Sequence, residues 1–129
     1  MEDLLYEVRD GIGFATLNRP QARNALTFPM YERLAALCGE IASDPGLRAF
    51  VVTGAGDRAF AAGTDISQFQ DFRTAEDALA YEARVDRVLT AIEECPKPTI
   101  AAIAGACTGG GAAIAAVCDM RLGTADARI

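Results

Sequence analysis

The sequence predicts an α/β domain in which helices cover a mostly parallel β-sheet. Short apolar, β-branched runs alternate with longer stretches whose apolar residues recur every three or four positions, giving the order strand, helix, strand, helix, strand. The stretches between these runs are long enough for crossover connections, which join parallel strands. The chain has 129 residues, so we expect a single domain over residues 1–129 with one substantial core.

The chain is expected to open with a β-hairpin. Apolar and polar residues partly alternate from Leu4 to Val8, and the residues from Asp10 to Gly13 have turn chemistry. A second, mostly apolar strand then runs from Ile12 to Leu17, before the polar loop that contains QARN.

Two long helices are predicted, and each has one apolar face. The first begins after Thr27, a capping residue, and has Pro29 in its first turn. The second begins after Thr74, which forms a weak capping box with Asp77, and runs to about Glu94. Both faces have the spacing i, i+4, i+7, i+8, i+11, which is that of a helix packed on a core. Their residues are Met30, Leu34, Leu37, Cys38 and Ile41 in the first helix, and Tyr81, Val85, Val88, Leu89 and Ile92 in the second.

Three further strands are expected, with loops rather than strands between them and the helices. The first two, Ala49 to Thr53 and Thr99 to Ile103, are short and apolar and therefore buried. The turn-rich GAGDRAF follows the first, and a loop ending in three glycines follows the second. A short helix then runs to about Val117, and Met120 to Gly123 is the last strand. The loops at the carboxyl ends of parallel strands are where such folds bind ligands.

Charge and hydropathy exclude several classes of protein. With 12 Lys and Arg against 18 Asp and Glu, the net charge is -6, which argues against a nucleic-acid or anionic-membrane surface. No apolar run reaches the ~18 residues of a membrane span, and MEDLLYEVRD lacks a signal pattern, so a cytoplasmic location is expected. The hydrophobic fraction of 51% is slightly high and consists largely of alanine. This excess of apolar residues either has no functional meaning or marks a surface that binds a partner.

The four cysteines are expected to be reduced thiols of the core. They show no CxxC spacing, and the sequence has no histidine to complete a zinc site or a Cys/His pair, so no metal is predicted. Cys107 precedes the glycine loop and could be a nucleophile activated by a helix terminus, but the core-thiol interpretation is favoured.

Two segments at strand ends combine glycines with bare backbone N–H groups. They are AGTDI, residues 62–66, and the triplet 109–111 before a helix. If two of these N–H groups converge, they can bind an ester or thioester oxygen as its negative charge develops. The alternative is that the glycines only permit tight turns and close packing. The triplet matches neither the GxGxxG pattern, because Ile114 stands at the third glycine position, nor a phosphate-binding P-loop, because no Lys follows.

Five charged residues are further candidates for roles at such a site. Asp65 could be catalytic, but an Asp after a tight turn more often bonds its own loop. Asp119 is expected to order the turn after its helix. Arg19, Arg23 and Arg33 surround NRPQARN and either meet phosphates or belong to a solvated loop.

Taken together, these segments resemble the N-terminal part of a crotonase superfamily protein, in the enoyl-CoA hydratase/isomerase family. The resemblance covers nearly the whole chain through LNRPQARNAL, FVVTGAGDRAFAAGTDI, KPTIAAIAG, GGG and CDMRLGTADARI, in the family's order and spacing. It implies the ClpP/crotonase spiral of ββα units, here without the C-terminal helical part. It also implies a homo-oligomer, since the family forms trimers or dimers of trimers.

The resemblance implies a site that binds an acyl-CoA thioester and stabilises an enolate. The thioester carbonyl would lie between the backbone amides of Thr64 and Gly110, and no prosthetic group would be needed, since coenzyme A is part of the substrate. By resemblance, the coenzyme A moiety would lie along Ala22, Arg23, Ala62, Gly63, Asp65 and Ile66.

The chain departs from the hydratases of this family in its acid and base residues. Hydratases carry a Glu at the position of Ala113, and their second Glu lies roughly twenty residues further along, beyond Ile129, so neither expected proton-transfer group is in this chain. Isomerases of the family can dispense with the first. The leading hypothesis is therefore an acyl-CoA-processing lyase or isomerase; the alternatives are a non-catalytic acyl-CoA binding or assembly module and an inactive fragment.

Overall fold

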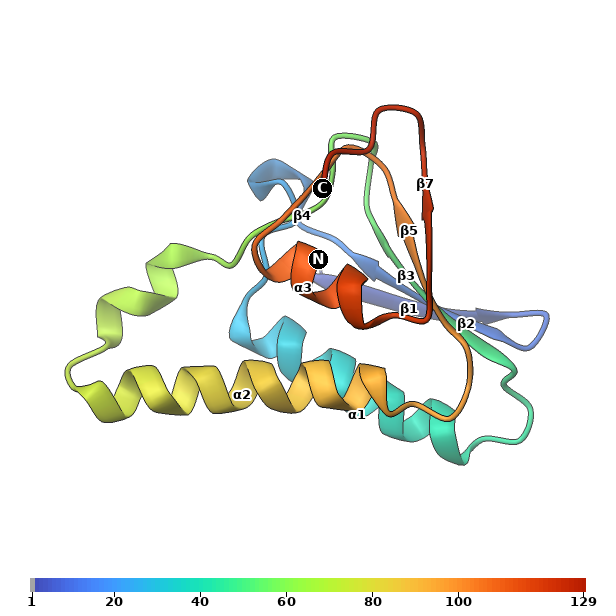
Figure 1. Ribbon diagram of the computed structural model, residues 1–129, viewed down its shortest axis with the longest axis horizontal. Coiled ribbons are helices and arrows are strands. Elements are labelled where there is room, and N and C mark those ends of the chain that lie inside the picture. Colours follow the sequence, from blue (N-terminus) through green and yellow to red (C-terminus); the bar gives the residue numbers. More distant parts are fainter. Residues whose placement is uncertain (1) are drawn as a thin grey trace.

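The main layer of the molecule is a five-stranded sheet with the strand order β1-β2-β3-β5-β7 (Figure 1). The computed structural model describes residues 2–129, with residues 68 and 71 described by their backbone only. The first two strands are antiparallel, and every other neighbouring pair is parallel, which confirms the predicted mostly parallel sheet. The strands are β1 (Leu4–Arg9), β2 (Ile12–Leu17), β3 (Ala49–Gly54), β5 (Thr99–Ile103) and β7 (Met120–Gly123).

A second, two-stranded sheet lies beside the first. It pairs β4 (Ala59–Ala62) in parallel with β6 (Ala106–Thr108). Turns and a loop were predicted for these residues, and that prediction was wrong. Each strand is too short to show a period, and each is completed only by a partner more than forty residues away along the chain. Burial of Ala59, Phe60 and Ala61 anchors the pair in the interior.

Among the described residues three α-helices connect these strands, and the first two begin where their capping threonines predict. They are α1 (Phe28–Ser43), α2 (Ala75–Glu93) and α3 (Gly110–Val117), with 3-10 helices η1 (Pro20–Ala22) and η2 (Ile66–Asp71) in two of the loops. Thr27 and Thr74 each accept a hydrogen bond from the third residue of their helix at 3.3 Å. The order β1-β2-α1, β3-β4-α2, β5-β6-α3 repeats a ββα unit three times, as the resemblance implied.

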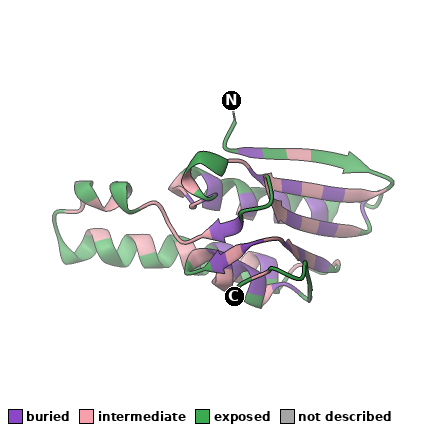
Figure 2. Ribbon diagram, turned by 90° about the horizontal axis from the view of Figure 1, so that it is seen from above, coloured by how far each residue is buried: buried purple, intermediate pink, exposed green. Residues whose placement is uncertain are grey.

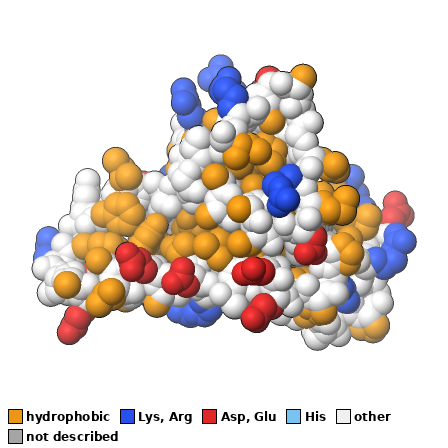
Figure 3. Space-filling view, viewed as in Figure 1, with side chains coloured by type: hydrophobic (Ala, Val, Ile, Leu, Met, Phe, Trp, Pro, Cys, Tyr) orange, Lys and Arg blue, Asp and Glu red, His pale blue; other side chains and the backbone are white. Residues whose placement is uncertain are grey.

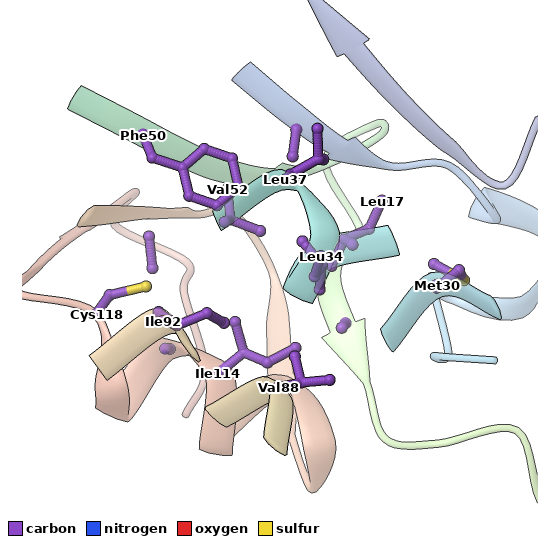
Figure 4. Packing of buried hydrophobic residues seen from close by; sticks show 14 of the residues in the cluster. Leu17, Met30, Leu34, Leu37, Phe50, Val52, Val88, Ile92, Ile114 and Cys118 are labelled. Atoms are coloured by element: carbon purple, nitrogen blue, oxygen red, sulfur yellow. The ribbon is translucent and has the colours of Figure 1, made fainter. Parts of the chain in front are cut away.

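The core forms where the three helices meet the sheet (Figure 4). α1 packs on β2 and β3, α2 on α1 and α3, and α3 on β4, β5 and β6. Burying a large apolar side chain stabilises the fold by about 1.5–3 kcal/mol, so this single cluster is the main source of stability. Its members include Leu17, Leu34, Leu37, Phe50, Val52, Val88, Ile92 and Ile114, all exposed by 2% or less.

The two long helices differ in how deeply their apolar faces lie. All five face residues of α1 are buried, whereas in α2 only Val88 and Ile92 are, and the other three are half-buried. Figure 2 shows why: the N-terminal half of α2, together with η2, extends beyond the sheet as an arm. In Figure 3 hydrophobic side chains run along this arm, with acidic side chains below them. The predicted core face of α2 is confirmed only for its C-terminal half.

Candidate active site

Pairing of β4 with β6 brings the two glycine-containing segments side by side. Where the strands end, the Gly63 N–H donates to the Thr108 carbonyl at 3.0 Å. The next residues of each segment stay close, because a Cβ on Gly109 would lie 3.1 Å from the Gly63 Cα atom. A Cβ on Gly110 would lie 2.9 Å from the Thr64 Oγ1 atom. Thr64 and the first residue of α3 are therefore neighbours, although 46 positions apart in the sequence.

Two backbone N–H groups at this junction have no acceptor within the described part of the chain. On both sides of Thr64 the backbone is paired, since the Leu26 N–H donates to Gly63 and the Asp65 N–H donates to Leu26, each at 2.9 Å. This bridge turns the Thr64 N–H away from Leu26, and no acceptor is recorded for it among the described residues. Gly110 is the first residue of α3, so its N–H has no intrahelical partner.

Glycine is required here by both conformation and space. Gly109 has φ +54°, which L side chains rarely adopt. At Gly110, a Cβ would lie 2.2 Å from the Tyr31 hydroxyl oxygen and 3.2 Å from the Leu26 side chain. The close packing that was the alternative explanation of these glycines is therefore present.

Two tyrosine hydroxyl groups contact the Thr64 hydroxyl and form a cluster of three with it. The Tyr31 hydroxyl lies 2.9 Å from Thr64 Oγ1, and the Tyr81 hydroxyl donates to the same oxygen at 3.4 Å. Burial raises the pKa of Tyr31, while its hydrogen bond to Thr64 lowers it by less, so the phenol is neutral at physiological pH. Sequence reasoning missed Tyr31, which lies in α1 outside the predicted apolar stripe and acquires its role only through tertiary contact.

Asp65 is fully engaged within its surroundings. Its carboxylate accepts from the Ser67 N–H at 2.9 Å and the Ser67 hydroxyl at 2.7 Å, and it forms an ion pair with Arg19 at 2.9 Å. The two hydrogen bonds from Ser67, followed by the hydrogen bond and the charge of Arg19, lower the pKa of Asp65 below its usual value. The carboxylate is thus held ionised by its partners. Its bonds to Ser67 agree with the prediction that Asp65 bonds its own loop.

The residues predicted to line the coenzyme A moiety lie close together. Ala22 ends η1, and Arg23 follows in the left-handed region with φ 52°. The Ala62 N–H donates to the Arg23 carbonyl at 3.0 Å, which joins this turn to the 62–66 segment. Further along the segment, the Ile66 side chain is 77% exposed.

Three arginines surround a cleft next to these residues. The cleft has a volume of about 380 Å³ and is lined by Arg23, Asp57, Arg58, Gly105, Asp126 and Arg128. Basic side chains gather at the top of the view in Figure 3, where the loops after β3 and β7 lie in Figure 1. Sequence reasoning missed two of these arginines, which are brought together when the Ala106 N–H bonds the Arg58 carbonyl and the Cys107 N–H bonds the Arg128 carbonyl.

Of the three arginines that the sequence analysis singled out, only Arg23 lines this cleft. Arg19 donates to the Ala25 carbonyl at 2.7 Å in addition to its pair with Asp65. Arg33 lies 3.9 Å from Glu40 on the exposed side of α1. Arg23 is thus the one of the three whose surroundings include further arginines in the described structure.

The remaining candidates have structural roles. Cys38, Cys107 and Cys118 are buried, burial raises the pKa of each thiol, and all four cysteines are free, as predicted. The Asp119 carboxylate accepts from the Thr99 N–H at 2.9 Å and ties the start of β7 to that of β5. Within residues 2–129, no group of three His, Cys, Asp or Glu side chains could hold a metal ion, and no described helix is long and apolar enough to cross a membrane.

Comparison with known proteins gives consistent matches. The pattern of the family described as enoyl-CoA hydratase/isomerase matches residues 7–129. A short-chain-enoyl-CoA hydratase of Clostridium acetobutylicum is 34% identical over 128 residues, covering 99% of this chain and 49% of that protein. A rat mitochondrial Delta(3,5)-Delta(2,4)-dienoyl-CoA isomerase is 38% identical, covering 86% and 37%.

Solved structures match equally well. An enoyl-CoA hydratase/carnithine racemase from Magnetospirillum magneticum superposes with a TM-score of 0.91 at 39% identity, covering 98% of this chain and 48% of that one. An enoyl-CoA hydratase/isomerase from Xanthobacter autotrophicus Py2 gives a TM-score of 0.91 at 35% identity, covering 98% and 47%. The chain spans about half the length of the relatives it matches.

Proposed function

Because the chain belongs to the enoyl-CoA hydratase/isomerase family, we propose that it binds the thioester carbonyl of an acyl-CoA between the Thr64 and Gly110 backbone N–H groups. The observation that carries this proposal is the pair of N–H groups without recorded acceptors on adjacent segments. Preorganised donors of this kind stabilise the negative charge of an enolate, and each is worth about 3 kcal/mol in a transition state.

The arginine cleft, which lies where β4 and β6 begin, supports coenzyme A as the carrier of the acyl group. Coenzyme A bears phosphates, and the guanidinium groups of Arg23, Arg58 and Arg128 are suited to bind them in an otherwise acidic protein. In this proposal the adenine and pantetheine lie along the turn at Ala22 and the segment 62–66. Binding by phosphate contacts weakens with salt, so the affinity for free coenzyme A should fall as ionic strength rises.

Proton transfer is the step for which the described site has no evident group. Ala112 and Ala113 occupy the first turn of α3, where a carboxylate could reach a bound acyl group, and the nearby Asp65 is held by Arg19 and Ser67. We therefore expect the 129-residue chain not to hydrate crotonyl-CoA. This feature favours the second candidate function, a non-catalytic acyl-CoA binding module; isomerase or lyase chemistry would need a base from elsewhere.

Substitution of Gly110 tests the proposed binding mode. In Gly110→Ala the new Cβ would lie 2.2 Å from the Tyr31 hydroxyl oxygen, so the first turn of α3 must shift and its N–H must move. Calorimetric titration should give an affinity for acetoacetyl-CoA at least about tenfold below that of the wild type, the loss expected for one well-placed donor. The matched control is Gly39→Ala in α1, whose Cβ would have no neighbour within 4 Å and which should bind normally.

Two results would contradict the proposal. One is a wild-type chain that binds neither acetoacetyl-CoA nor free coenzyme A. The other is a folded Gly110→Ala variant, verified by circular dichroism, that binds acetoacetyl-CoA as tightly as Gly39→Ala does.

Assembly into a homo-oligomer is part of the same proposal, and exposed apolar residues support it. β7 lies at the edge of the sheet, all four of its residues are exposed, and Met120 and Leu122 are 50% and 57% exposed. An open edge with apolar side chains favours association. Sedimentation equilibrium should give a mass that is a multiple of the 13.6 kDa chain, and we expect a trimer or a hexamer. We also propose a cytoplasmic location for the protein.

A further inference from the structure

The hydroxyl cluster around Thr64 contains more donors than its own hydrogen bonds consume. The three hydroxyl groups of Tyr31, Thr64 and Tyr81 carry three protons, and two hydrogen bonds join them. Tyr81 donates its proton to Thr64. The other bond, between Tyr31 and Thr64, uses either the Tyr31 proton or the Thr64 proton, so one of these two is left over.

Burial decides the direction of the bond between Tyr31 and Thr64. The Tyr31 side chain is 1% exposed, and Thr64 is the one partner recorded for its hydroxyl among the described residues. If Thr64 donated to Tyr31, the Tyr31 proton would be buried without an acceptor, which is costly. Tyr31 is therefore the donor.

Thr64 Oγ1 then accepts from both tyrosines, which uses both of its acceptor positions. Its own proton is left without a partner in the described part of the chain. Thr64 is only half-buried, and its Oγ1 atom lies where a Cβ of Gly110 would come within 2.9 Å. The spare proton thus belongs to the residue whose backbone N–H is also without an acceptor, beside the start of α3.

We propose that the Thr64 hydroxyl is a third hydrogen-bond donor to the acyl-CoA thioester oxygen, oriented by Tyr31 and Tyr81. This inference rests on the proposed function of the Thr64 and Gly110 amides and adds a side-chain donor to them. A hydroxyl that accepts two hydrogen bonds is polarised and donates more strongly. Burial keeps the Tyr31 phenol neutral, and hence a donor to Thr64, across the physiological pH range.

The pKa of bound acetoacetyl-CoA is the most direct measure of this third donor. Ionisation gives an enolate that absorbs in the near ultraviolet, and each hydrogen bond to the enolate oxygen lowers the pKa of the bound ligand. Thr64→Val keeps the shape and the backbone N–H but removes the hydroxyl. It should raise the pKa of the bound ligand by about one unit, a tenfold weaker preference for the enolate. Thr64→Ser, which keeps the hydroxyl, should stay within about 0.3 unit of the wild type.

Free coenzyme A separates this inference from the proposed function. It has no thioester oxygen, so its binding by the wild type reports the coenzyme A site alone and not the third donor. If the wild type binds neither ligand, the proposed function fails and the ligand role of Thr64 fails with it. If the wild type binds both and Thr64→Val leaves the pKa of bound acetoacetyl-CoA unchanged, only the third donor is overturned.

Tyr31→Phe tests the direction of the buried bond through the sign of its effect. With Tyr31 as donor, its loss makes Thr64 a weaker donor, and the pKa of bound acetoacetyl-CoA should rise by less than in Thr64→Val. With Thr64 as donor, the same substitution would release the Thr64 proton to the ligand and lower that pKa. A lowered or unchanged pKa in Tyr31→Phe therefore overturns the assignment.

Thermal stability tests the same assignment without any ligand. Thr64→Val removes the acceptor of the buried Tyr31 hydroxyl and should lower the Tm by about 5 °C. Adding Tyr31→Phe to it removes the orphaned donor and should recover most of the loss, while Thr64→Ser should change the Tm little. A Tyr31→Phe single variant that is more stable than the wild type would show that the Tyr31 proton has no acceptor and would overturn the inference.

Discussion

α1 and α2 carry the same spacing of apolar residues, but only α1 is a core helix along its whole length. The five apolar face residues of α1 are at most 3% exposed. In α2, burial is limited to Val88 and Ile92, near its C-terminal end. α1 lies on the sheet, whereas the first half of α2 extends beyond it (Figure 2). Spacing therefore predicts which face of a helix is apolar, and the layer beneath the helix decides how deeply that face is buried.

The less buried half of α2 contributes to the site rather than to the core. Tyr81 donates to Thr64 and belongs to an aromatic cluster with Phe28, Phe69 and Phe72, whose ring centroids lie 5.0 to 6.1 Å from its own. A small cleft of about 210 Å³ opens between this cluster and the first turns of α2. The same half of the helix thus supplies both Tyr81 and part of the lining of this cleft.

The largest expected difference between the two helices is that between Leu34→Ala and Leu79→Ala. Leu34 of α1 is 0% exposed, so its truncation leaves a cavity and should lower the free energy of unfolding by about 3–4 kcal/mol. Leu79 of α2 is 62% exposed, and its truncation should cost no more than about 0.5 kcal/mol. Urea denaturation measures both, and similar losses in the two variants would show that the arm of α2 is packed against something in solution.

A matched pair within α2 locates the point where the helix leaves the core. Val88→Ala and Val85→Ala remove the same atoms one turn apart. Val88 is 2% exposed and should lose about 2 kcal/mol, whereas the half-buried Val85 should lose about 1 kcal/mol or less. The midpoints of thermal unfolding report the difference. A larger loss in Val85→Ala than in Val88→Ala would contradict the position at which we end the buried part of α2.

The sequence predicts local features of this fold well because their causes are local. Thr27 and Thr74 cap helices with their own side chains, and Pro29 lies in the first turn of α1, so residues within four positions determine these helix starts. The turn of the opening hairpin is equally local. The boundaries of β1, β2 and β3 consequently differ from prediction by one residue at most.

The features that the sequence does not predict all depend on pairing between distant segments. β4 and β6 are short runs that become strands only together, and the arginine cleft is assembled by their neighbouring backbone bonds. The role of Tyr31 depends on Thr64, which is 33 residues away. Resemblance to a family suggested Thr64 and Gly110, and the two N–H groups left without acceptors are a structural reason to propose them that spacing alone could not give.

The two capping threonines should differ in what their loss affects. Removing either Thr side chain costs about 1 kcal/mol of helix stability. Because α1 is fixed to the sheet, Thr27→Ala should lower the urea midpoint of the whole domain. Because the first half of α2 is not, Thr74→Ala should mainly increase hydrogen exchange over residues 75–80 and leave the midpoint almost unchanged. Equal shifts of the midpoint in both variants would mean that α2 unfolds only with the whole domain.

The smallest expected effect concerns two thiols, Cys38 in α1 and Cys95 just after α2. Cys38 is 3% exposed, and burial, aided by the neighbouring Cys95 and Cys118, raises the pKa of its thiol to about 12. Cys95 is only half-buried. Since the thiolate is the reactive form, a disulfide reagent at pH 8 should modify Cys95 first and leave Cys38 unmodified until the protein unfolds.

The control for this prediction is Cys95→Ser, which should lack the rapid modification expected of Cys95. Cys38→Ser should retain this rapid modification. Rapid modification that persists in Cys95→Ser would mean that a thiol described as buried is open to solvent.

The raised pKa of the Cys38 thiol also has a consequence for stability. An exposed thiol ionises near pH 9.0 and the folded Cys38 thiol near 12, so the folded state holds the proton more tightly. The contribution of Cys38 to the free energy of unfolding should therefore be complete below pH 9 and decline between about pH 9 and pH 12, and Cys38→Ser should weaken that decline.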